Sequence, residues 1–207
     1  KDNVTEMYKE MKIIDNYIKS SFTPRRFTIN SQKITLDDKK YENMFRGISI
    51  LERGPMQIAG QCSCGEVSYE LSEEPMFVHA CHCSLCKQQT GSAFIAHAFI
   101  ESAHFHLSSG TLRSVFGASG SGNPHEVDRC ESCGTAIISY YEGQREWGVV
   151  KVGTLQNPDQ FPPGVHLHIK QKVSWIEIPE DVPAFEEGYD FETLWPSEGY
   201  TRFMNFF

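Results

Sequence analysis

Apolar and polar residues alternate over many short segments between residues 56 and 178, most clearly at 66–71 and 173–178. An alternation of period two places successive side chains on opposite faces of a β-strand. A short helix of one or two turns is predicted around residues 84–90. Many short strands separated by turns indicate a mainly β fold. The predicted strands are 56–62, 66–71, 76–81, 93–100, 104–107, 111–116, 125–129, 135–141, 147–152 and 166–178.

The first 55 residues follow a different pattern. Asn3 followed by Glu6 is typical of a capping box at the start of a helix, and Pro24 would end that helix. Its polar face mixes acidic and basic residues, which favours packing on the domain or on a second subunit over binding to a membrane surface. The helix is therefore a candidate contact for a homo-oligomer. An amphipathic helix across about residues 3–20 is predicted from the helical spacing of Val4, Met7, Tyr8, Met11, Ile14 and Ile18.

These patterns divide the chain into three parts. Residues 1–55 form an N-terminal helical extension, and residues 56–185 form the β domain. Residues 186–207 are rich in acidic and aromatic side chains and are expected to pack on the domain as a C-terminal tail. A loop rich in Gly and Ser at 117–124 interrupts the β domain.

Charge and hydropathy exclude two classes of protein. The formal net charge is −8 over 207 residues, and no cluster of Lys and Arg forms a basic surface, so nucleic-acid binding is not expected. No apolar run approaches the roughly 18 residues of a membrane-spanning helix. We expect a cytoplasmic protein without membrane contact. The chain begins at Lys1 rather than at Met, which leaves open whether an upstream segment has been removed.

All seven cysteines lie in three clusters. A disulfide framework would leave one thiol unpaired, and a chain of this size does not need disulfides to supplement its core. Buried, inert cysteines would not recur at spacings of two and three. The pattern therefore indicates metal binding. The clusters are Cys62-x-Cys64-Gly65, Cys81-x-Cys83-x-x-Cys86 and Cys130-x-x-Cys133-Gly134.

The spacing divides the cysteines into two unequal sites. A Cys-x-x-Cys-Gly turn brings two sulfur atoms together, and Cys-x-Cys projects both side chains from one face of an extended segment. The two outer pairs, joined, give a closed four-thiolate site typical of structural zinc: Cys62, Cys64, Cys130 and Cys133. The central triplet of Cys81, Cys83 and Cys86 then has three thiolates and an open position, as catalytic zinc does.

A histidine could instead close the second site. His82 lies between two of the ligands, and on an extended backbone its side chain points away from a metal that they share. His79 precedes Cys81 by two residues and shares its face, which makes it the better candidate, either as a fourth ligand or as a group beside the metal. His97, His104 and His106 follow the triplet on predicted strands and are weaker candidates.

The order of these motifs resembles the glutathione-dependent formaldehyde-activating enzyme family, which also includes the centromere-protein-V-like proteins. The resemblance covers roughly residues 56–185, including Gly153-Thr154-Leu155 and Pro183-Ala184-Phe185. It implies a β-tent fold of antiparallel sheets with two zinc ions per chain. It also implies that the four outer cysteines hold a structural zinc, and that Cys81, Cys83 and Cys86 hold the catalytic one.

The family's activity is that of a carbon–sulfur lyase, the reversible joining of glutathione and formaldehyde to S-hydroxymethylglutathione. The resemblance therefore implies a small thiol, with glutathione as the candidate, and an aldehyde as substrates. Three thiolate ligands suit a soft sulfur better than water, so hydrolysis of an imine is the less favoured reaction. Arg113, Lys151 and Lys170 are candidates to meet the carboxylates of a glutathione-like ligand. The alternative is a zinc-stabilised module without catalytic activity that binds a protein partner.

Overall fold

The structure, a computed structural model, describes residues 27–29, 32–34, 58–119 and 122–207. The chain divides into two compact units, residues 1–53 and 54–207, and each is described by itself. In the first unit, β1 (Phe27–Ile29) and β2 (Gln32–Ile34) pair as an antiparallel hairpin that the sequence pattern did not predict. The helix predicted across residues 3–20 lies outside the described residues.

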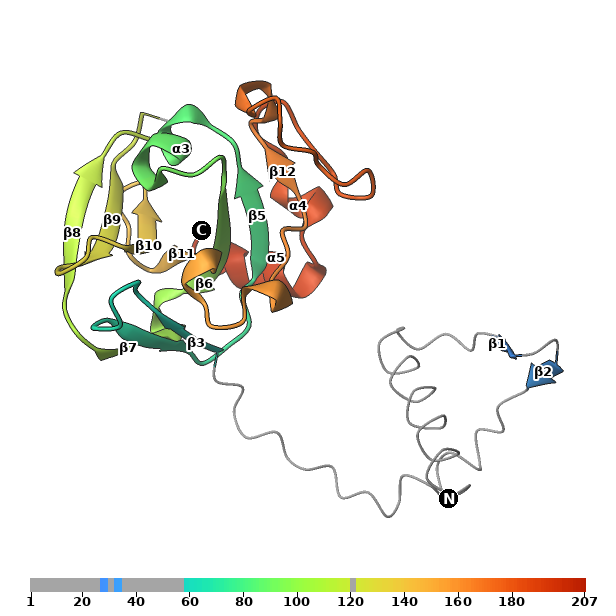
Figure 1. Ribbon diagram of the computed structural model, residues 1–207, viewed down its shortest axis with the longest axis horizontal. Coiled ribbons are helices and arrows are strands. Elements are labelled where there is room, and N and C mark those ends of the chain that lie inside the picture. Colours follow the sequence, from blue (N-terminus) through green and yellow to red (C-terminus); the bar gives the residue numbers. More distant parts are fainter. Residues whose placement is uncertain (1–26, 30–31, 35–57, 120–121) are drawn as a thin grey trace, which may run out of the picture. The chain divides into compact units, whose positions relative to one another are not determined.

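The second unit is built mainly from antiparallel strands, as predicted (Figure 1). A small sheet has the order β3-β4-β7, and a large sheet has the order β12-β5-β6-β11-β10-β9-β8, in which only β12 runs parallel to its neighbour. The small sheet consists of β3 (Ile58–Gln61), β4 (Ser68–Leu71) and β7 (Phe105–Ser109). The large sheet consists of β5 (Phe77–Cys81), β6 (Ile95–Glu101), β8 (Leu112–Gly117), β9 (His125–Cys130), β10 (Ala136–Tyr141), β11 (Trp147–Lys151) and β12 (His166–Leu167).

One face of the large sheet packs against the small sheet. The strand register places apolar side chains of β5, β6, β11 and β10 side by side on this face, and they form one buried cluster with residues of β3 and β4. Gly60 allows the closest approach within the small sheet, because a Cβ there would lie 2.2 Å from the ring of Tyr69. This core includes Val78, Ala98, Ile138, Val150, Tyr69 and Leu71.

The opposite face of the large sheet is covered in two different ways (Figure 1). At the Met76 end of β5, the helices α4 (Phe191–Leu194) and α5 (Ser197–Met204) add Trp195 and Phe203 to an aromatic cluster with Phe99 and Trp147. At the other end lies α3 (Ser84–Thr90), the short helix predicted around 84–90. The short 3-10 helices are Ser102–His104, Val152–Thr154, Pro158–Gln160 and Ile169–Gln171.

The predicted long strand over 166–178 is wrong, since only His166–Leu167 forms a strand, β12. The strand ends because His168 adopts the left-handed conformation (φ 55°) and a 3-10 helix follows. Within 173–178, Lys172 Nζ donates to the carbonyl oxygens of Val173 and Ile176, so these groups are used locally rather than in a sheet. The apolar alternation is not expressed as a buried face, because Trp175 is exposed.

Candidate metal centres

Four cysteines from two distant turns come together at one point. Cys62 and Cys64 lie between β3 and β4, whereas Cys130 is the last residue of β9 and Cys133 lies in the turn before β10. Their four sulfur atoms lie within 4.8 Å of one another. The Sγ atoms of Cys64 and Cys130 are 3.8 Å apart, and thiolates in a tetrahedron with Zn–S bonds of about 2.3 Å would be about 3.8 Å apart. The group therefore fits a zinc ion.

The two turns that carry these sulfur atoms have the local structure that a thiolate needs. Gly65 and Gly134 both have positive φ (80° and 74°), which allows each turn to fold back after its cysteines. The backbone N–H of Val67 donates to Cys62 Sγ at 3.2 Å. Hydrogen bonds with the Ser63 and Thr135 hydroxyl groups lower the pKa of Cys133 to about 5.

The four-cysteine site joins the two sheets. One pair of ligands belongs to a turn of the small sheet and the other to a turn of the large sheet. The Oγ atoms of Ser63 and Thr135 also meet across this junction, at 2.9 Å. A metal ion here would therefore link the small sheet to the large sheet at this end of the core.

The remaining three cysteines surround the start of α3. Cys81 is the last residue of β5, Cys83 is the N-cap of α3, and Cys86 lies in its first turn. Their sulfur atoms lie within 4.8 Å of one another. Cys83 Sγ also accepts a hydrogen bond from the backbone N of Cys86 at 3.3 Å, as a capping side chain does.

The pKa values of the three thiol groups depend on one another. Hydrogen bonds with Cys81 and Cys86 lower the pKa of Cys83, whereas the hydrogen bonds of Cys81 with Cys83 and Cys86 raise the pKa of Cys81. Three thiolates at this separation repel one another, so a cation is needed to ionise all of them together. The donor set therefore suits a soft metal ion such as zinc.

The cluster of three sulfur atoms includes neither His79, the favoured candidate, nor His82. His79 Nδ1 is 3.1 Å from the Tyr189 hydroxyl group, and the ring packs edge-on against His97. His82 is fully buried on the other side of the backbone, where its Nε2 lies 2.8 Å from His166 Nδ1. Among the described residues, the second centre therefore has three clustered ligands.

A buried polar chain extends from Cys86 into the sheet. His97 Nε2 lies 3.8 Å from Cys86 Sγ, and His97 Nδ1 lies 3.1 Å from Lys151 Nζ. Lys151 Nζ also donates to Ser139 Oγ at 2.5 Å. Burial lowers the pKa of Lys151 to about 7, against the effect of the nearby Cys86 thiol. Lys151 is buried and does not face solvent. A lysine that binds a carboxylate of glutathione arriving from bulk water would have to be exposed.

This row of buried polar side chains was not predicted from the sequence. The signal was present, since Lys151 is the only charged residue within the apolar run Trp147-Gly-Val-Val-Lys-Val. A charge in such a run is buried only if polar groups surround it. The residues that surround it come from β6 and β10, which a single sequence does not place beside β11.

A second buried histidine lies near the same cluster. Gln89 Nε2 donates to Ala118 O at 3.1 Å and lies 3.3 Å from His125 Nδ1, so the amide also acts as donor to this nitrogen. His125 Nε2 is buried and has no hydrogen-bond partner among the described residues. The ring stacks on Tyr141 with centroids 4.4 Å apart. Burial lowers the pKa of His125 to about 4, although the nearby Cys83 opposes this shift.

Arg129 connects the two cysteine centres. Its Nη1 donates to the carbonyl oxygen of Gly134, beside Cys133, at 3.0 Å. Its Nη2 donates to the carbonyl oxygen of Gln89, in α3, at 2.9 Å. The planar guanidinium group thus holds the helix of one centre against the turn of the other.

The other weak candidates lie away from the cysteines. His104 Nδ1 and His106 Nε2 both contact the Ser72 hydroxyl group at the surface, at 2.9 and 3.2 Å. His104 belongs to a 3-10 helix rather than to the predicted strand. Lys170 is exposed and lies 3.5 Å from Glu187.

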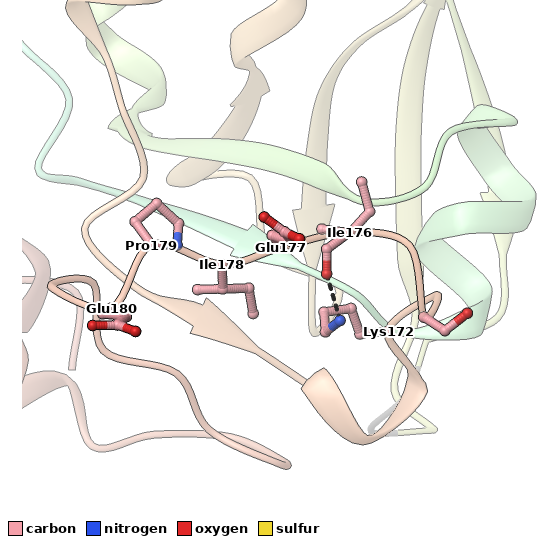
Figure 2. Close-up of a pocket in the computed structure, with 7 residues that line it drawn as sticks. Lys172, Ile176, Glu177, Ile178, Pro179 and Glu180 are labelled. Carbon is pink, nitrogen blue, oxygen red and sulfur yellow. Dashed lines mark hydrogen bonds between the residues drawn. The ribbon is translucent and has the colours of Figure 1, made fainter.

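A shallow hollow in the surface lies over residues 172–180 (Figure 2). Figure 2 shows Lys172 reaching the carbonyl oxygen of Ile176 within it. None of the seven cysteines lines this hollow, so it is separate from both metal centres. Its lining consists of Lys172, Ser174, Ile176, Glu177, Ile178, Pro179 and Glu180.

Comparison with known proteins agrees with the cysteine pattern. In the described part of the chain, no helix combines the length and apolar character that crossing a membrane requires. No curated protein matches the chain. A solved crystal structure of a Rhodobacter sphaeroides protein is similar at 17% identity with a TM-score of 0.38, covering 62% of this chain and 99% of that one. The family model described as glutathione-dependent formaldehyde-activating enzyme matches residues 57–171, more than half of the sequence. The chain belongs to the glutathione-dependent formaldehyde-activating enzyme family.

Proposed function

We propose that the protein is a zinc-dependent carbon–sulfur lyase that joins a small thiol, with glutathione as the first candidate, to formaldehyde or a related carbonyl compound. The observation that carries the proposal is the gathering of Cys81, Cys83 and Cys86 into one cluster without a fourth ligand among the described residues. Family membership supports the reaction class. The four outer cysteines are proposed to hold a second zinc ion with a structural role.

The proposed reaction adds a thiol across a carbonyl group. The S–H bond of the thiol breaks and a C–S bond forms, while the π bond of the carbonyl breaks and the proton ends on its oxygen. Zinc at the three cysteines, when bound, would supply the positive charge that stabilises a thiolate near neutral pH. The chain contributes the positions of the three sulfur atoms, held by the end of β5 and the first turn of α3.

Two histidines are proposed to act beside the cluster. His125 Nε2 is buried and has no hydrogen-bond partner among the described residues, and because Nδ1 lies 3.3 Å from the Gln89 amide we propose that the ring hydrogen is on Nε2. Such a donor is suited to the carbonyl oxygen, which gains negative charge as the thiol adds. His79 lies on the same face of β5 as Cys81, and its ring is held by the Tyr189 hydroxyl group. We propose that His79 helps to form the wall of the three-cysteine centre on that face of the sheet.

Metal analysis tests the division into two sites. We expect about two zinc ions per chain in the wild-type protein, and one in a Cys81/Cys83/Cys86→Ala variant that keeps its fold. Circular dichroism and gel filtration report the fold. If the triple variant loses all metal and unfolds, the assignment of a separate structural site is wrong.

The activity is tested by following S-hydroxymethylglutathione formation by NMR exchange spectroscopy against the uncatalysed background. We expect acceleration by the wild-type protein and none by the triple variant, with His125→Gln slower than wild type. Lack of acceleration by metal-loaded protein would reject this reaction. Turnover of an imine in the same assay would favour hydrolysis instead, and binding of a protein partner without turnover would favour the non-catalytic module.

Further assignments remain part of the proposal. We propose that the two sheets form the β-tent arrangement and that the protein acts in the cytoplasm. The division into residues 1–55, 56–185 and 186–207 is retained, with residues 3–20 as the candidate helix for self-association. Cross-linking and gel filtration of the full chain, compared with a chain beginning after residue 55, test this last prediction.

A further inference from the structure

Lys151 is a buried lysine without a carboxylate partner among the described residues. Its side chain is 6% exposed at the end of β11. The strand register places it opposite His97 of β6, and Ser139 of β10 completes its surroundings. The ion pairs found in the described part of the chain do not include it. Because an isolated buried charge is costly, Lys151 keeps its proton only where a negative charge other than a carboxylate lies nearby.

The hydrogen bonds of Lys151 determine which nitrogen of His97 carries a proton. When Lys151 is protonated, its ammonium group can only donate, so His97 Nδ1, at 3.1 Å, then acts as the acceptor. In the neutral ring the hydrogen then lies on Nε2. Nε2 is 3.8 Å from Cys86 Sγ, so this N–H is directed at a sulfur atom of the three-cysteine cluster. His97 itself is not part of that cluster.

The charges of the two groups are complementary. Three thiolates with one divalent cation carry a net charge of −1, and Lys151 supplies +1 through a single intervening ring. An N–H bond to a thiolate ligand draws electron density from sulfur, which leaves a bound metal a stronger Lewis acid. Lys151 and His97 would thus offset the weakness that three thiolate ligands impose on the metal.

We propose that Lys151 and His97 are positioning residues of the three-cysteine centre, which act together by donating an N–H to Cys86 and by balancing the charge of the metal–thiolate group. This inference rests on the proposed function only in assigning a metal to that centre. It assigns roles to two residues that lie outside the cluster of three sulfur atoms.

The test uses the full chain loaded with Co²⁺ in place of zinc, whose sulfur-to-cobalt charge-transfer band reports the electron density on the ligands. The contribution of the four-cysteine centre is common to all variants and cancels in difference spectra. Lys151→Met removes the charge at similar volume, and Lys170→Met is the matched control at an exposed lysine. His97→Leu removes the relay, whereas His97→Gln keeps an N–H near Cys86. Circular dichroism verifies the fold of each variant.

We expect the charge-transfer band to move to longer wavelength in Lys151→Met and His97→Leu, to move less in His97→Gln, and to stay unchanged in Lys170→Met. Loss of one cobalt ion from folded Lys151→Met alone also supports the proposal, because the group has lost its counter-charge. Unchanged spectra in Lys151→Met and His97→Leu would overturn it. So would altered ligand-field bands in the His97 variants alone, since His97 would then bind the metal directly.

These readouts do not depend on turnover. If the wild-type protein fails to accelerate thiol addition but the Lys151→Met spectrum shifts, the proposed function is wrong and the relay stands. If turnover is confirmed and the spectrum does not shift, the relay is wrong and the function stands.

Discussion

Replacing one sulfur by oxygen should cost different amounts of stability at the two cysteine centres. Cys64→Ser and Cys83→Ser each remove one ligand while leaving a side chain of similar shape. Cys64 is exposed and Cys83 is half-buried, so neither substitution opens a large cavity. The difference between them should therefore report what the bound metal does for the chain.

The structure sets the expected magnitude. The four-cysteine site links Cys64 to Cys130, 66 positions away, whereas the three-cysteine site spans only the five positions from Cys81 to Cys86. The entropy lost on closing a loop grows as (3/2)RT times the logarithm of its length. On this ground alone, a metal in the four-cysteine site should stabilise the fold by about 2 kcal/mol more than one in the three-cysteine site, at equal metal affinity.

The measurement is equilibrium urea unfolding of metal-loaded protein, followed by circular dichroism, with metal content determined for each sample. We expect Cys64→Ser to lower the free energy of unfolding by about 2 kcal/mol more than Cys83→Ser does. In the presence of a strong chelator, the two variants should become similar. Equal losses in metal-loaded protein, with one ion missing from each variant, would refute the reasoning that the first site is a long-range crosslink.

Three further predictions concern how the C-terminal helix is held on the sheet. Phe203→Ala should destabilise the domain by about 3 kcal/mol, because Phe203 is only 7% exposed and packs among aromatic rings. Phe207 is 75% exposed, so Phe207→Ala should cost less than about 0.5 kcal/mol. Urea unfolding of the two variants compares these losses. Gly199→Ala should lower the melting temperature, because a Cβ there would lie 2.1 Å from a backbone carbonyl oxygen of the segment before β5, and an unchanged melting temperature would contradict this contact. Burial raises the pKa of Glu101, but the hydrogen bonds from Arg202 at 2.7 and 2.6 Å outweigh it and hold the pKa below its usual value of 4.5. The pair should therefore stabilise the fold fully above the unfolded pKa and lose this contribution as the pH falls through the folded pKa. The stability difference between wild type and Arg202→Met, about 1–2 kcal/mol at neutral pH, should close once Glu101 is protonated in the folded state.

The cysteine turns could be predicted from the local sequence. The spacing within each pair is short enough that backbone geometry alone brings the sulfur atoms together, and Gly65 and Gly134 have the positive φ that such turns require. The helix around residues 84–90 was also predicted, and the structure shows that Cys83 caps it from the adjacent residue. Most strands were also predicted, because each is a short run of apolar or alternating residues between turns.

Segment 173–178 shows where such a pattern fails. It alternates as a strand does, yet Lys172 bonds to its carbonyl oxygens and Trp175 remains in solvent. Whether an alternating segment becomes a strand depends on whether a neighbour offers a free edge. At this edge of the large sheet, the two residues of β12 take the place beside β5 and the chain then turns away.

The sequence by itself predicted that the seven cysteines form groups of four and three that could hold metal ions, because the spacing within each cluster is local and the count leaves one triplet over. Only the tertiary structure decided what surrounds them. It placed Lys151 and His97 behind Cys86, paired His82 with His166, and buried His125 Nε2 without a hydrogen-bond partner among the described residues. These arrangements arise from the register between strands far apart in the chain, and register is fixed by the packing of whole sheets rather than by any one segment.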